Sequence, residues 1–546
     1  MHEPNPGIRD LVWPRPPLST RRSLLAGRVD VVRVVCVLMV CALAAVPSLA
    51  SALGRPWTIT PDHDFIAVYN ALLFNTGLPQ ENFDFTAYPL YLALAAWFRL
   101  YEAFGLVAIA DFATLQAAGT WEESFAELIA AGRVLMLVFG VAMTLTVYLV
   151  LRRMVVWPAA IAMTAVFAVS QGLAVNLHLI RPDLPSAFFY LAATGALLLA
   201  RRWDVSLPFR LAFAAALAWL SIQAKLQTVP AVFALFLLAQ FVLPAADDDP
   251  DPHDHDYFEK LADMGPAWLF FGFVTAMPLL YEIWQILDGN GFKIMGYQVA
   301  LAGFAIANMV VYWLRTGVPG IAATTVGALL AGLGIAHLLH YVHPSYVNIE
   351  GPLYFIDVKL GFVGEGVSAS GEGYLSGTEF DAVALGLRML DGVWFVLAGK
   401  VLEWRTLVWG ACIWIGLGAS AIDLLRGRWR RAMLPLALIL LALGIDVLAS
   451  LRRQPIYPVF VEMLAVLGCA VAVQHLFART APRRVRALAI GCAALLVVAS
   501  TAINLDSRSP LMTHPSLAFP PTEPCTITRA FNKRMAHVFD HYCRPE

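Results

Sequence analysis

The chain has 546 residues, of which 59% are hydrophobic and 14% charged, and its formal net charge at pH 7 is −1. Because soluble globular domains are about 45–50% apolar and about 25% charged, this composition excludes an ordinary water-soluble protein and indicates that much of the chain lies in lipid. No basic domain stands out, so we expect no nucleic acid among the partners of this protein.

Segment 1–30 is polar and rich in Pro and Arg, and an apolar run of about 20 residues follows it. A secretory signal peptide reaches its apolar core sooner and ends at a small-residue cleavage site, so we expect an uncleaved first span. Since one spanning helix needs about 20 mostly apolar residues, the sequence predicts about thirteen spans. They lie at 31–53, 132–151, 155–175, 183–200, 210–224, 228–244, 264–286, 294–314, 317–341, 405–424, 432–450, 457–476 and 486–503.

Short arginine-rich segments mark the cytoplasmic side of a membrane protein. If the predicted spans alternate in direction, five arginine-rich segments fall on the same side of the membrane. They contain Arg21 and Arg22; Arg152 and Arg153; Arg201 and Arg202; Arg426, Arg428, Arg430 and Arg431; and Arg479, Arg483, Arg484 and Arg486. We therefore expect a cytoplasmic N-terminus and a periplasmic C-terminus, in the inner membrane of a bacterium, since the excess of Arg over Lys is typical of GC-rich bacterial genomes.

The predicted organisation is a cytoplasmic segment over 1–30, a transmembrane module over 31–503 and a short extracytoplasmic tail over 504–546. Two large outer loops, at 54–131 and 342–404, interrupt the module. The tail contains Cys525 and Cys543, and an oxidising compartment permits a disulfide between them. Closing that loop would stabilise the fold by about 3 kcal/mol in the chain-entropy description. The alternative is two unpaired thiols.

Asp62 and Asp64 stand where the chain leaves the first predicted span on its outer side. Segment 64–76 has apolar residues at helical spacing, which predicts an amphipathic helix at the bilayer surface that Gly77 and Pro79 end. A second amphipathic stretch begins near Tyr88. Paired carboxylates beside a bilayer suit a substrate with a lipid tail and a polar head.

Three roles are open for these two carboxylates. One of them can deprotonate an acceptor hydroxyl as a general base, which typically contributes about 10²–10⁴-fold to a rate. Two acidic residues spaced by one can instead hold a divalent metal ion through oxygen ligands. In a purely structural role, Asp62 caps the surface helix.

Charged residues mark two further places near the outer ends of predicted spans. Asp183 either caps the helix that begins there or, together with Arg181, contacts a substrate. Lys225 lies between two short apolar segments, where a lysine either extends its amine to the membrane surface or binds an anion such as phosphate. Ionisable groups at membrane depth are costly, so both places are functional candidates.

Arg452 and Arg453 form the one double-arginine short loop that the predicted topology places outside. They break the positive-inside bias, and a phosphate-bearing lipid would explain them, since arginine forms bidentate bonds to phosphate oxygens. The alternative is a different number of spans.

His337, His340 and His343 recur at helical spacing near the outer end of the ninth predicted span. Imidazoles in this arrangement can bind zinc, although histidines at a membrane interface more often hold no metal. No nucleotide-binding, Cys-x-x-Cys or serine-nucleophile motif stands in a plausible context, and no inverted repeat of the kind that many transporters carry is evident.

In its layout the chain resembles the GT-C superfamily of membrane glycosyltransferases, in the branch of protein O-mannosyltransferases and aminoarabinose transferases. The match covers most of the chain through short motifs. The first outer loop of that branch opens with an acidic residue followed by Tyr, Ala, Gly and Pro. The matching positions are Asp64, Tyr69, Ala71, Gly77 and Pro79, then Tyr88 to Tyr91, Arg133, Arg181, Asp183, Lys225, Arg453, Tyr457 and Pro458.

The resemblance implies an all-α, GT-C-like bundle of about 13 transmembrane helices with amphipathic helices in the first extracytoplasmic loop. It also implies transfer of a hexosyl or pentosyl group, with inversion, from a polyprenyl-phosphate donor to a glycolipid, glycan or protein acceptor on the outer face. The implied base is Asp62 or Asp64, and Arg452, Arg453 and Lys225 would bind the donor phosphate. The implied substrate-binding residues are Tyr69, Tyr88, Arg181, Asp183 and Tyr457.

This chain has Asp-His-Asp where the family usually has Asp-Glu, so the resemblance leaves open which carboxylate is the base. Some relatives need a divalent metal ion and others do not, so the cofactor also stays open. The main rival function is a lipid flippase or polytopic transporter, which favours polar residues near the bilayer midplane. Here the charged candidates gather at one membrane face, which favours surface chemistry.

Overall fold

The structure is a computed structural model, and it describes residues 31–54, 64–81, 87–198, 206–225, 228–241, 259–289, 296–342, 407–450 and 458–477, with a few positions between 387 and 398. Over these residues the chain forms helices and no β-strand. Several predictions lie outside the described residues. They concern Asp62, His343, Arg452, Arg453, Tyr457, Cys525 and Cys543, the side chain of His340, the span at 486–503, most of the loop 342–404, and segments 1–30 and 504–546.

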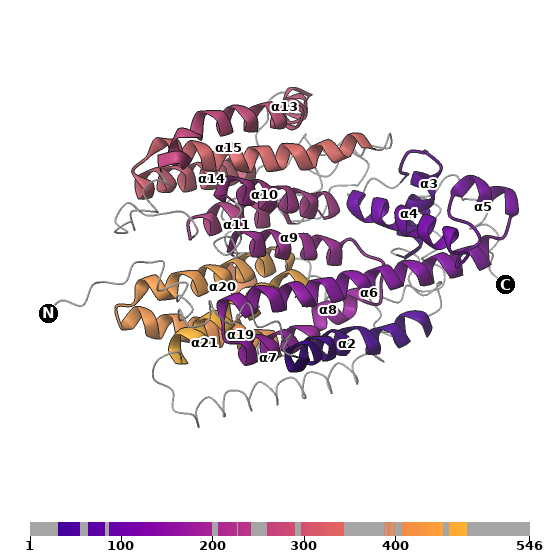
Figure 1. Ribbon diagram of the computed structural model, residues 1–546, viewed down its shortest axis with the longest axis horizontal. Helices are drawn as coiled ribbons and strands as arrows, with labels where there is room; N and C mark the ends of the chain where they lie inside the picture. The colour runs from indigo at the N-terminus through magenta and orange to yellow at the C-terminus, as the bar shows by residue number, and fades with distance from the viewer. Residues whose placement is uncertain are drawn as a thin grey trace.

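A bundle of helices extends along the longest axis of the molecule (Figure 1). In the first half of the chain they are α2 (Val31–Gly54), α6 (Trp121–Met154), α7 (Trp157–Ala168), α8 (Gln171–Asn176), α9 (Asp183–Leu198), α10 (Leu207–Ala224) and α11 (Val229–Ala239). In the second half they are α13 (Gly265–Gly289), α14 (Gly296–Thr316), α15 (Pro319–His337) with the 3₁₀ turn η7 (Leu338–Val342), α19 (Leu407–Leu425), α20 (Trp429–Ser450) and α21 (Pro458–Phe477).

Every predicted span before residue 478 coincides with one or two of these helices. Within the described residues, four helical stretches are long and apolar enough to cross a bilayer. They are Glu123–Met154, Leu207–Ala224, Gly265–Gln285 and Pro319–His337. With the composition, these stretches make the chain an integral membrane protein. The number of about thirteen spans stays a prediction.

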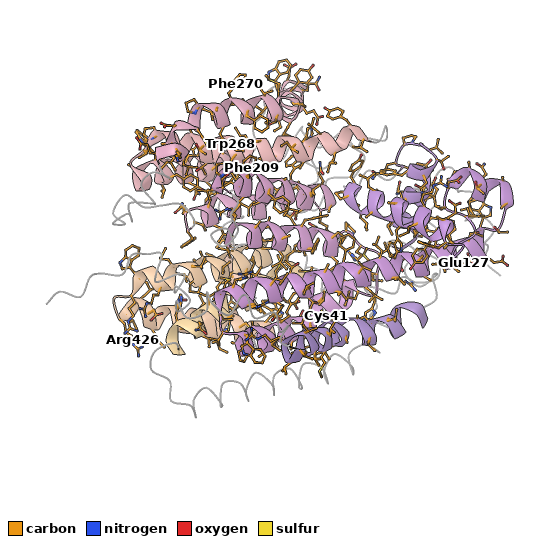
Figure 2. All side chains as sticks on the ribbon, in the orientation of Figure 1. Cys41, Glu127, Phe209, Trp268, Phe270 and Arg426 are labelled. Atoms are coloured by element: carbon orange, nitrogen blue, oxygen red, sulfur yellow. The ribbon has the colours of Figure 1, made fainter. Side chains whose placement is uncertain are left out.

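Helix α6 is the longest of the described helices, and it also packs against α3 (Ile66–Asn75), α4 (Tyr88–Ala103) and α5 (Phe112–Ala118). Its 34 residues extend roughly 50 Å at about 1.5 Å per residue, whereas the hydrocarbon core of a bilayer is about 30 Å thick. Arg152 and Arg153 occupy its last turn. A hydrocarbon layer that began there would reach about as far as Arg133. Figure 2 labels Glu127, in the part of α6 beyond Arg133, at the end of the molecule opposite Arg426.

Three helices gather around the N-terminal part of α6: α3 (Ile66–Asn75), α4 (Tyr88–Ala103) and α5 (Phe112–Ala118). The predicted helix at 64–76 is present, and Gly77 follows it in the left-handed conformation with φ 74°. It does not lie half exposed on a surface, however, because every side chain from Ile66 to Phe74 is buried. The reason is that α4, α5 and α6 enclose it.

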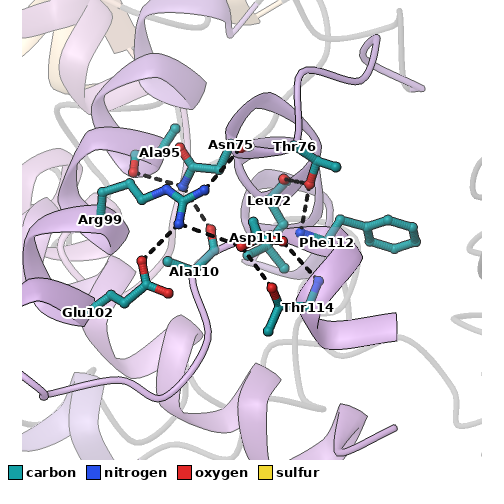
Figure 3. A network of polar contacts seen from close by, with 10 residues as sticks. All are labelled: Leu72, Asn75, Thr76, Ala95, Arg99, Glu102, Ala110, Asp111, Phe112 and Thr114. Carbon is teal, nitrogen blue, oxygen red and sulfur yellow. Dashed lines mark hydrogen bonds and ion pairs between the residues drawn. The ribbon is translucent and has the colours of Figure 1, made fainter. Parts of the chain in front are cut away.

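A polar network holds α3, α4 and α5 together (Figure 3). The side-chain amide of Asn75 donates to the carbonyl oxygens of Ala95 at 3.0 Å and Ala110 at 2.8 Å. Arg99 donates to the carbonyl oxygen of Asn75 at 3.1 Å and pairs with Glu102 at 2.8 Å. The Asp111 carboxylate accepts the Thr114 N–H at 2.9 Å and so caps α5. The polar side of α3 is therefore satisfied by protein rather than by water.

Glycines bring α13 and α15 into close contact. A Cβ atom placed on Gly327 would lie 2.3 Å from the carbonyl carbon of Trp268, and one on Gly272 would lie 2.3 Å from the carbonyl oxygen of Gly327. Small residues of this kind let membrane helices approach closely. On α13, Phe270 stays 73% exposed, as expected for a ring that faces lipid (Figure 2).

Candidate functional site

Asp64 lies at the start of α3 with no exposed surface, and its carboxylate binds two other parts of the chain. Arg133 of α6 donates to its Oδ2 from Nε at 3.0 Å and from Nη2 at 2.7 Å. The backbone N–H of Ile180 donates to its Oδ1 at 2.7 Å. The three hydrogen bonds compensate for burying a charged pair, which is otherwise costly.

The sequence next to Arg133 allows this contact. Gly132 precedes it on α6, and a Cβ atom at Gly132 would lie 2.5 Å from the Cδ1 atom of Ile180. A larger residue would push the segment that contains Ile180 away from α6. Leu94 of α4 also packs against this point, at 3.3 Å from the same Cβ position.

Asp183, the first residue of α9, is fully buried and forms a second ion pair. Arg181 donates from Nε to its Oδ2 at 3.1 Å, and the Nζ atom of Lys225 lies 2.7 Å from its Oδ1. Lys225 is the residue that ends α10, and its side chain is almost fully buried. In this structure the amine of Lys225 therefore faces Asp183 and does not extend to the membrane surface.

Hydroxyl groups fix the backbone around Lys225. Its N–H donates to the carbonyl oxygen of Ser221 at 2.9 Å, and its own carbonyl oxygen accepts the hydroxyl of Thr228 at 2.6 Å. Ser221 also donates to the carbonyl oxygen of Ser186 on α9 at 2.8 Å. These bonds connect α9, α10 and the start of α11, so the lysine has a defined position.

The two ion pairs meet through the short segment between α8 and α9. Ile180 binds Asp64 through its backbone, and the adjacent Arg181 binds Asp183 through its side chain. Charged residues from α3, α6, α9 and α10 therefore converge at one end of the bundle. We call these five residues the ion-pair cluster. They are Asp64, Arg133, Arg181, Asp183 and Lys225.

Helix α4 joins the ion-pair cluster at its first residues. The N–H of Ala87 donates to the carbonyl oxygen of Ala224 at 3.1 Å, next to Lys225. Ala87 has φ 25°, a conformation that non-glycine residues rarely adopt and that stores strain of about 1–3 kcal/mol. Tyr88 follows it, and its hydroxyl donates to the carbonyl oxygen of Leu339 at 3.0 Å. Tyr88 thus connects α4 with η7.

Tyr69 lies on α3. It is fully buried, and its hydroxyl donates to Oε2 of Glu81 at 2.5 Å, while the N–H of Glu81 donates to the side-chain oxygen of Asn70 at 3.1 Å. Its ring packs edge-on against Phe112. Of the three predicted substrate-binding tyrosines, the two that the structure describes, Tyr69 and Tyr88, therefore lie at the same end of the bundle as the ion-pair cluster, each with a protein partner.

His337 is fully buried at the end of α15. Its Nε2 atom lies 3.3 Å from Oε1 of Glu282, which also accepts the hydroxyl of Tyr341 at 3.1 Å, and its ring packs edge-on against Trp219. Where the structure describes the chain, no group of three or more His, Cys, Asp or Glu side chains is arranged to hold a metal ion.

Asp64, the residue of the Asp62–Asp64 pair that the structure describes, does not fit a divalent cation. Both oxygens of Asp64 accept hydrogen bonds, and a cation at that carboxylate would lie next to the guanidinium group of Arg133, which would repel it. We therefore assign no step of the chemistry to a metal ion.

Sequence reasoning missed several partners of the residues it named. Arg133 was noted only as part of a motif, although a single arginine in an otherwise apolar span is a signal for a buried acidic partner. Glu81, the partner of Tyr69, carries no such signal, because acidic residues are ordinary in loops. Glu282, the partner of His337, lies inside the predicted span 264–286, so the same signal was present there and was missed.

No protein-family model and no curated protein sequence matches the chain. Among solved structures, it is similar to the oligosaccharyltransferase of Archaeoglobus fulgidus in complex with Zn and sulfate, with 16% identity and a TM-score of 0.44 over 93% of this chain and 57% of the other. A second structure of that enzyme, tethered to an acceptor peptide containing the NVT sequon, gives 16% identity and a TM-score of 0.42 over 93% and 58%. The chain thus spans less than two thirds of the length of these structures.

Proposed function

We propose that this protein is a membrane glycosyltransferase that moves a sugar from a polyprenyl-phosphate donor to an acceptor on the extracytoplasmic face of a bacterial inner membrane. The observation that carries the proposal is the ion-pair cluster. Buried charges from four helices converge at the end of the bundle where the helices of the first outer loop gather. Buried charges in a membrane protein are costly, and a reaction between a charged lipid and a polar acceptor at this boundary would explain them.

The proposed reaction is a single inverting displacement. A carboxylate accepts the proton of an acceptor hydroxyl, and that oxygen forms a bond to the anomeric carbon of the sugar. The bond between this carbon and the phosphate oxygen breaks, and its electron pair leaves with the polyprenyl phosphate. Cationic groups fixed beside the leaving phosphate stabilise the charge that develops there. We assign this role to Arg452, Arg453 and Lys225.

The geometry of Asp64 supports a division of labour between the two acidic residues of the first loop. A base needs a free oxygen for the incoming proton, whereas both oxygens of Asp64 accept hydrogen bonds from Arg133 and Ile180. We therefore assign the general base to Asp62 and a positioning role to Asp64, which ties the start of α3 to α6 and to the segment between α8 and α9.

We assign substrate contacts to Tyr69, Tyr88, Arg181, Asp183 and Tyr457. The described members of this group lie at the same end of the bundle and come from separate elements. Within the proposal, Asp183 holds Lys225 and Arg181 so that their charges face the phosphate. The acceptor class is a glycolipid, a glycan or a protein, and the sugar is a hexose or a pentose.

The test is transfer of labelled sugar from a panel of polyprenyl-phosphate sugars to native membrane acceptors by the purified protein in lipid. Asp62→Asn and Arg453→Ala are expected to lose transfer while remaining folded. Glu127→Gln, which changes an exposed carboxylate at the same end, serves as the control and is expected to keep transfer (Figure 2).

Two outcomes would overturn the proposal. One is a wild-type protein that transfers sugar from no donor of the panel, and the other is equal transfer by all variants. Either result would direct attention to a flippase or transporter, for which movement of a labelled lipid across vesicles is the appropriate measurement.

A further inference from the structure

Glu462 is a carboxylate inside α21 with no exposed surface, five positions into a predicted span. The hydroxyl of Ser170 donates to its Oε2 at 2.6 Å, and the backbone N–H of Gly172 donates to its Oε1 at 2.9 Å. A carboxylate at this place costs several kcal/mol to bury unless it is hydrogen-bonded, and the proposed chemistry gives it no role.

Both contacts of Glu462 are made to the start of α8. Ser170 occupies the position before that helix, where a serine side chain usually accepts an N–H group of its own first turn. Here Ser170 makes no such bond. Glu462 accepts the N–H of Gly172 in its place, so a side chain from α21 caps α8 across a sequence separation of 290 positions.

The far end of the same segment is held by the ion-pair cluster. Ile180 donates its N–H to Asp64, and Asp183 pairs with Lys225. The segment from Ser170 to Asp183 is therefore held by hydrogen bonds or ion pairs at three places: at its start, at Ile180 and at Asp183. Each fastening point uses a buried carboxylate, and the three carboxylates belong to α21, α3 and α9. Arg181 lies on this segment.

We propose that Glu462 is a positioning residue of the site. It holds the segment from Ser170 to Asp183, so that Ile180 and Arg181 keep their positions beside Asp64 and Asp183. This inference rests on the proposed function. A displacement of about 1 Å at a reacting centre can reduce a rate on the order of 100-fold, which is why a second support for this segment would matter. Glu462 itself touches no substrate in this scheme.

Two variants distinguish positioning from chemistry. Glu462→Gln keeps a carbonyl oxygen for the N–H of Gly172 and a polar group for Ser170, whereas Glu462→Ala removes both. We expect kcat/KM for the donor to fall about 10- to 100-fold in Glu462→Ala and to be largely restored in Glu462→Gln. If the two variants lost activity equally, Glu462 would be an acid or base, and the proposal would be overturned.

The matched control is Asp423, a buried carboxylate on α19 that pairs with Arg428. It lies at the other end of the bundle, where Figure 2 labels the nearby Arg426. Asp423→Ala also removes a buried carboxylate, so it measures the general loss of stability. We expect it to lower the amount of folded protein and to leave kcat/KM per folded molecule unchanged.

Hydrogen exchange gives a readout that does not depend on sugar transfer. Amides between residues 170 and 183 should exchange faster in Glu462→Ala than in wild type, Glu462→Gln or Asp423→Ala, while amides of α13 and α15 stay unchanged. Unchanged exchange at 170–183 would overturn the positioning role. Faster exchange with full activity would overturn its connection to the site. A wild type without transfer would instead overturn the proposed function, and the exchange result would still decide whether Glu462 holds the segment.

Discussion

Arg133 and Asp64 stand 69 positions apart in the sequence, yet two nitrogens of the arginine bind the same carboxylate oxygen at 3.0 and 2.7 Å. This pair joins the start of α3 to α6, the longest of the described helices. It also lies about where α6 would leave a bilayer that begins at Arg152.

Breaking this pair should be strongly destabilising. Arg133→Met leaves Asp64 as a buried carboxylate without its cation, and we expect a loss of about 3–5 kcal/mol in the free energy of unfolding. The double variant Arg133→Met with Asp64→Asn should recover part of that loss, because no unpaired charge remains. Unfolding of the purified protein in detergent measures both. Arg152→Met, which changes an exposed arginine on the same helix, should stay within about 0.5 kcal/mol of wild type.

Lys225 offers a prediction about catalysis. Lys225→Met removes one of the cations assigned to the leaving phosphate, and loss of one such fixed donor typically lowers kcat by about 10²–10³-fold. The exposed Lys260→Met is the matched control and should leave transfer unchanged. A Lys225→Met protein that is folded and fully active would exclude Lys225 from the phosphate site. The readout is initial rate against donor concentration.

The network of Figure 3 contains both part-buried and exposed polar contacts, whose contributions to stability should differ. Asn75→Ala removes the group that donates to the carbonyl oxygens of Ala95 and Ala110, so we expect a cost of about 1–3 kcal/mol. Arg99→Ala breaks an ion pair whose arginine is 44% exposed, and such pairs contribute about 0–1 kcal/mol. Thermal unfolding should rank the two variants in that order, and the reverse order would contradict the description of α3 as an enclosed helix.

Close packing of α13 and α15 leads to a fourth prediction. Gly327→Leu places side-chain atoms where the backbone of Trp268 already lies, so the two helices must separate and the yield of folded protein should fall sharply. Gly303→Ala on α14 meets no atom within 4 Å and should be neutral or slightly stabilising, because alanine favours a helix by about 1 kcal/mol over glycine. Size-exclusion profiles of both variants test this.

Apolar run length predicted where the helices lie, since a stretch such as 317–341 contains the whole of α15. It failed at 155–175, which is two helices, α7 and α8, with a break before Gln171. The break itself, at Val169 and Ser170, contains no proline or glycine, although Gly172 follows in the first turn of α8. The group that accepts the N–H of Gly172 is Glu462, far along the chain. The sequence around 155–175 does not predict a contact with a residue so far along the chain.

The site shows the same limit. A charge in an apolar context identified Asp64, Asp183 and Lys225 as candidates, because burial of a charge needs a reason. Their partners follow from helix packing, which spacing along the chain does not encode. The predicted environment of α3 was wrong for a related reason. Its amphipathic pattern assumed a bilayer on one side and water on the other, whereas α4 and α5 cover it.

The cap of α8 has a consequence for biosynthesis. Glu462 is made 290 residues after Gly172, and at about 5–20 residues per second the ribosome needs roughly 15 to 60 s to reach it. During that interval the start of α8 lacks its carboxylate partner, so the hydrogen bonds that join α21 to α8 form only after α21 has been made. Capping of α8 is therefore a late event in the maturation of this protein.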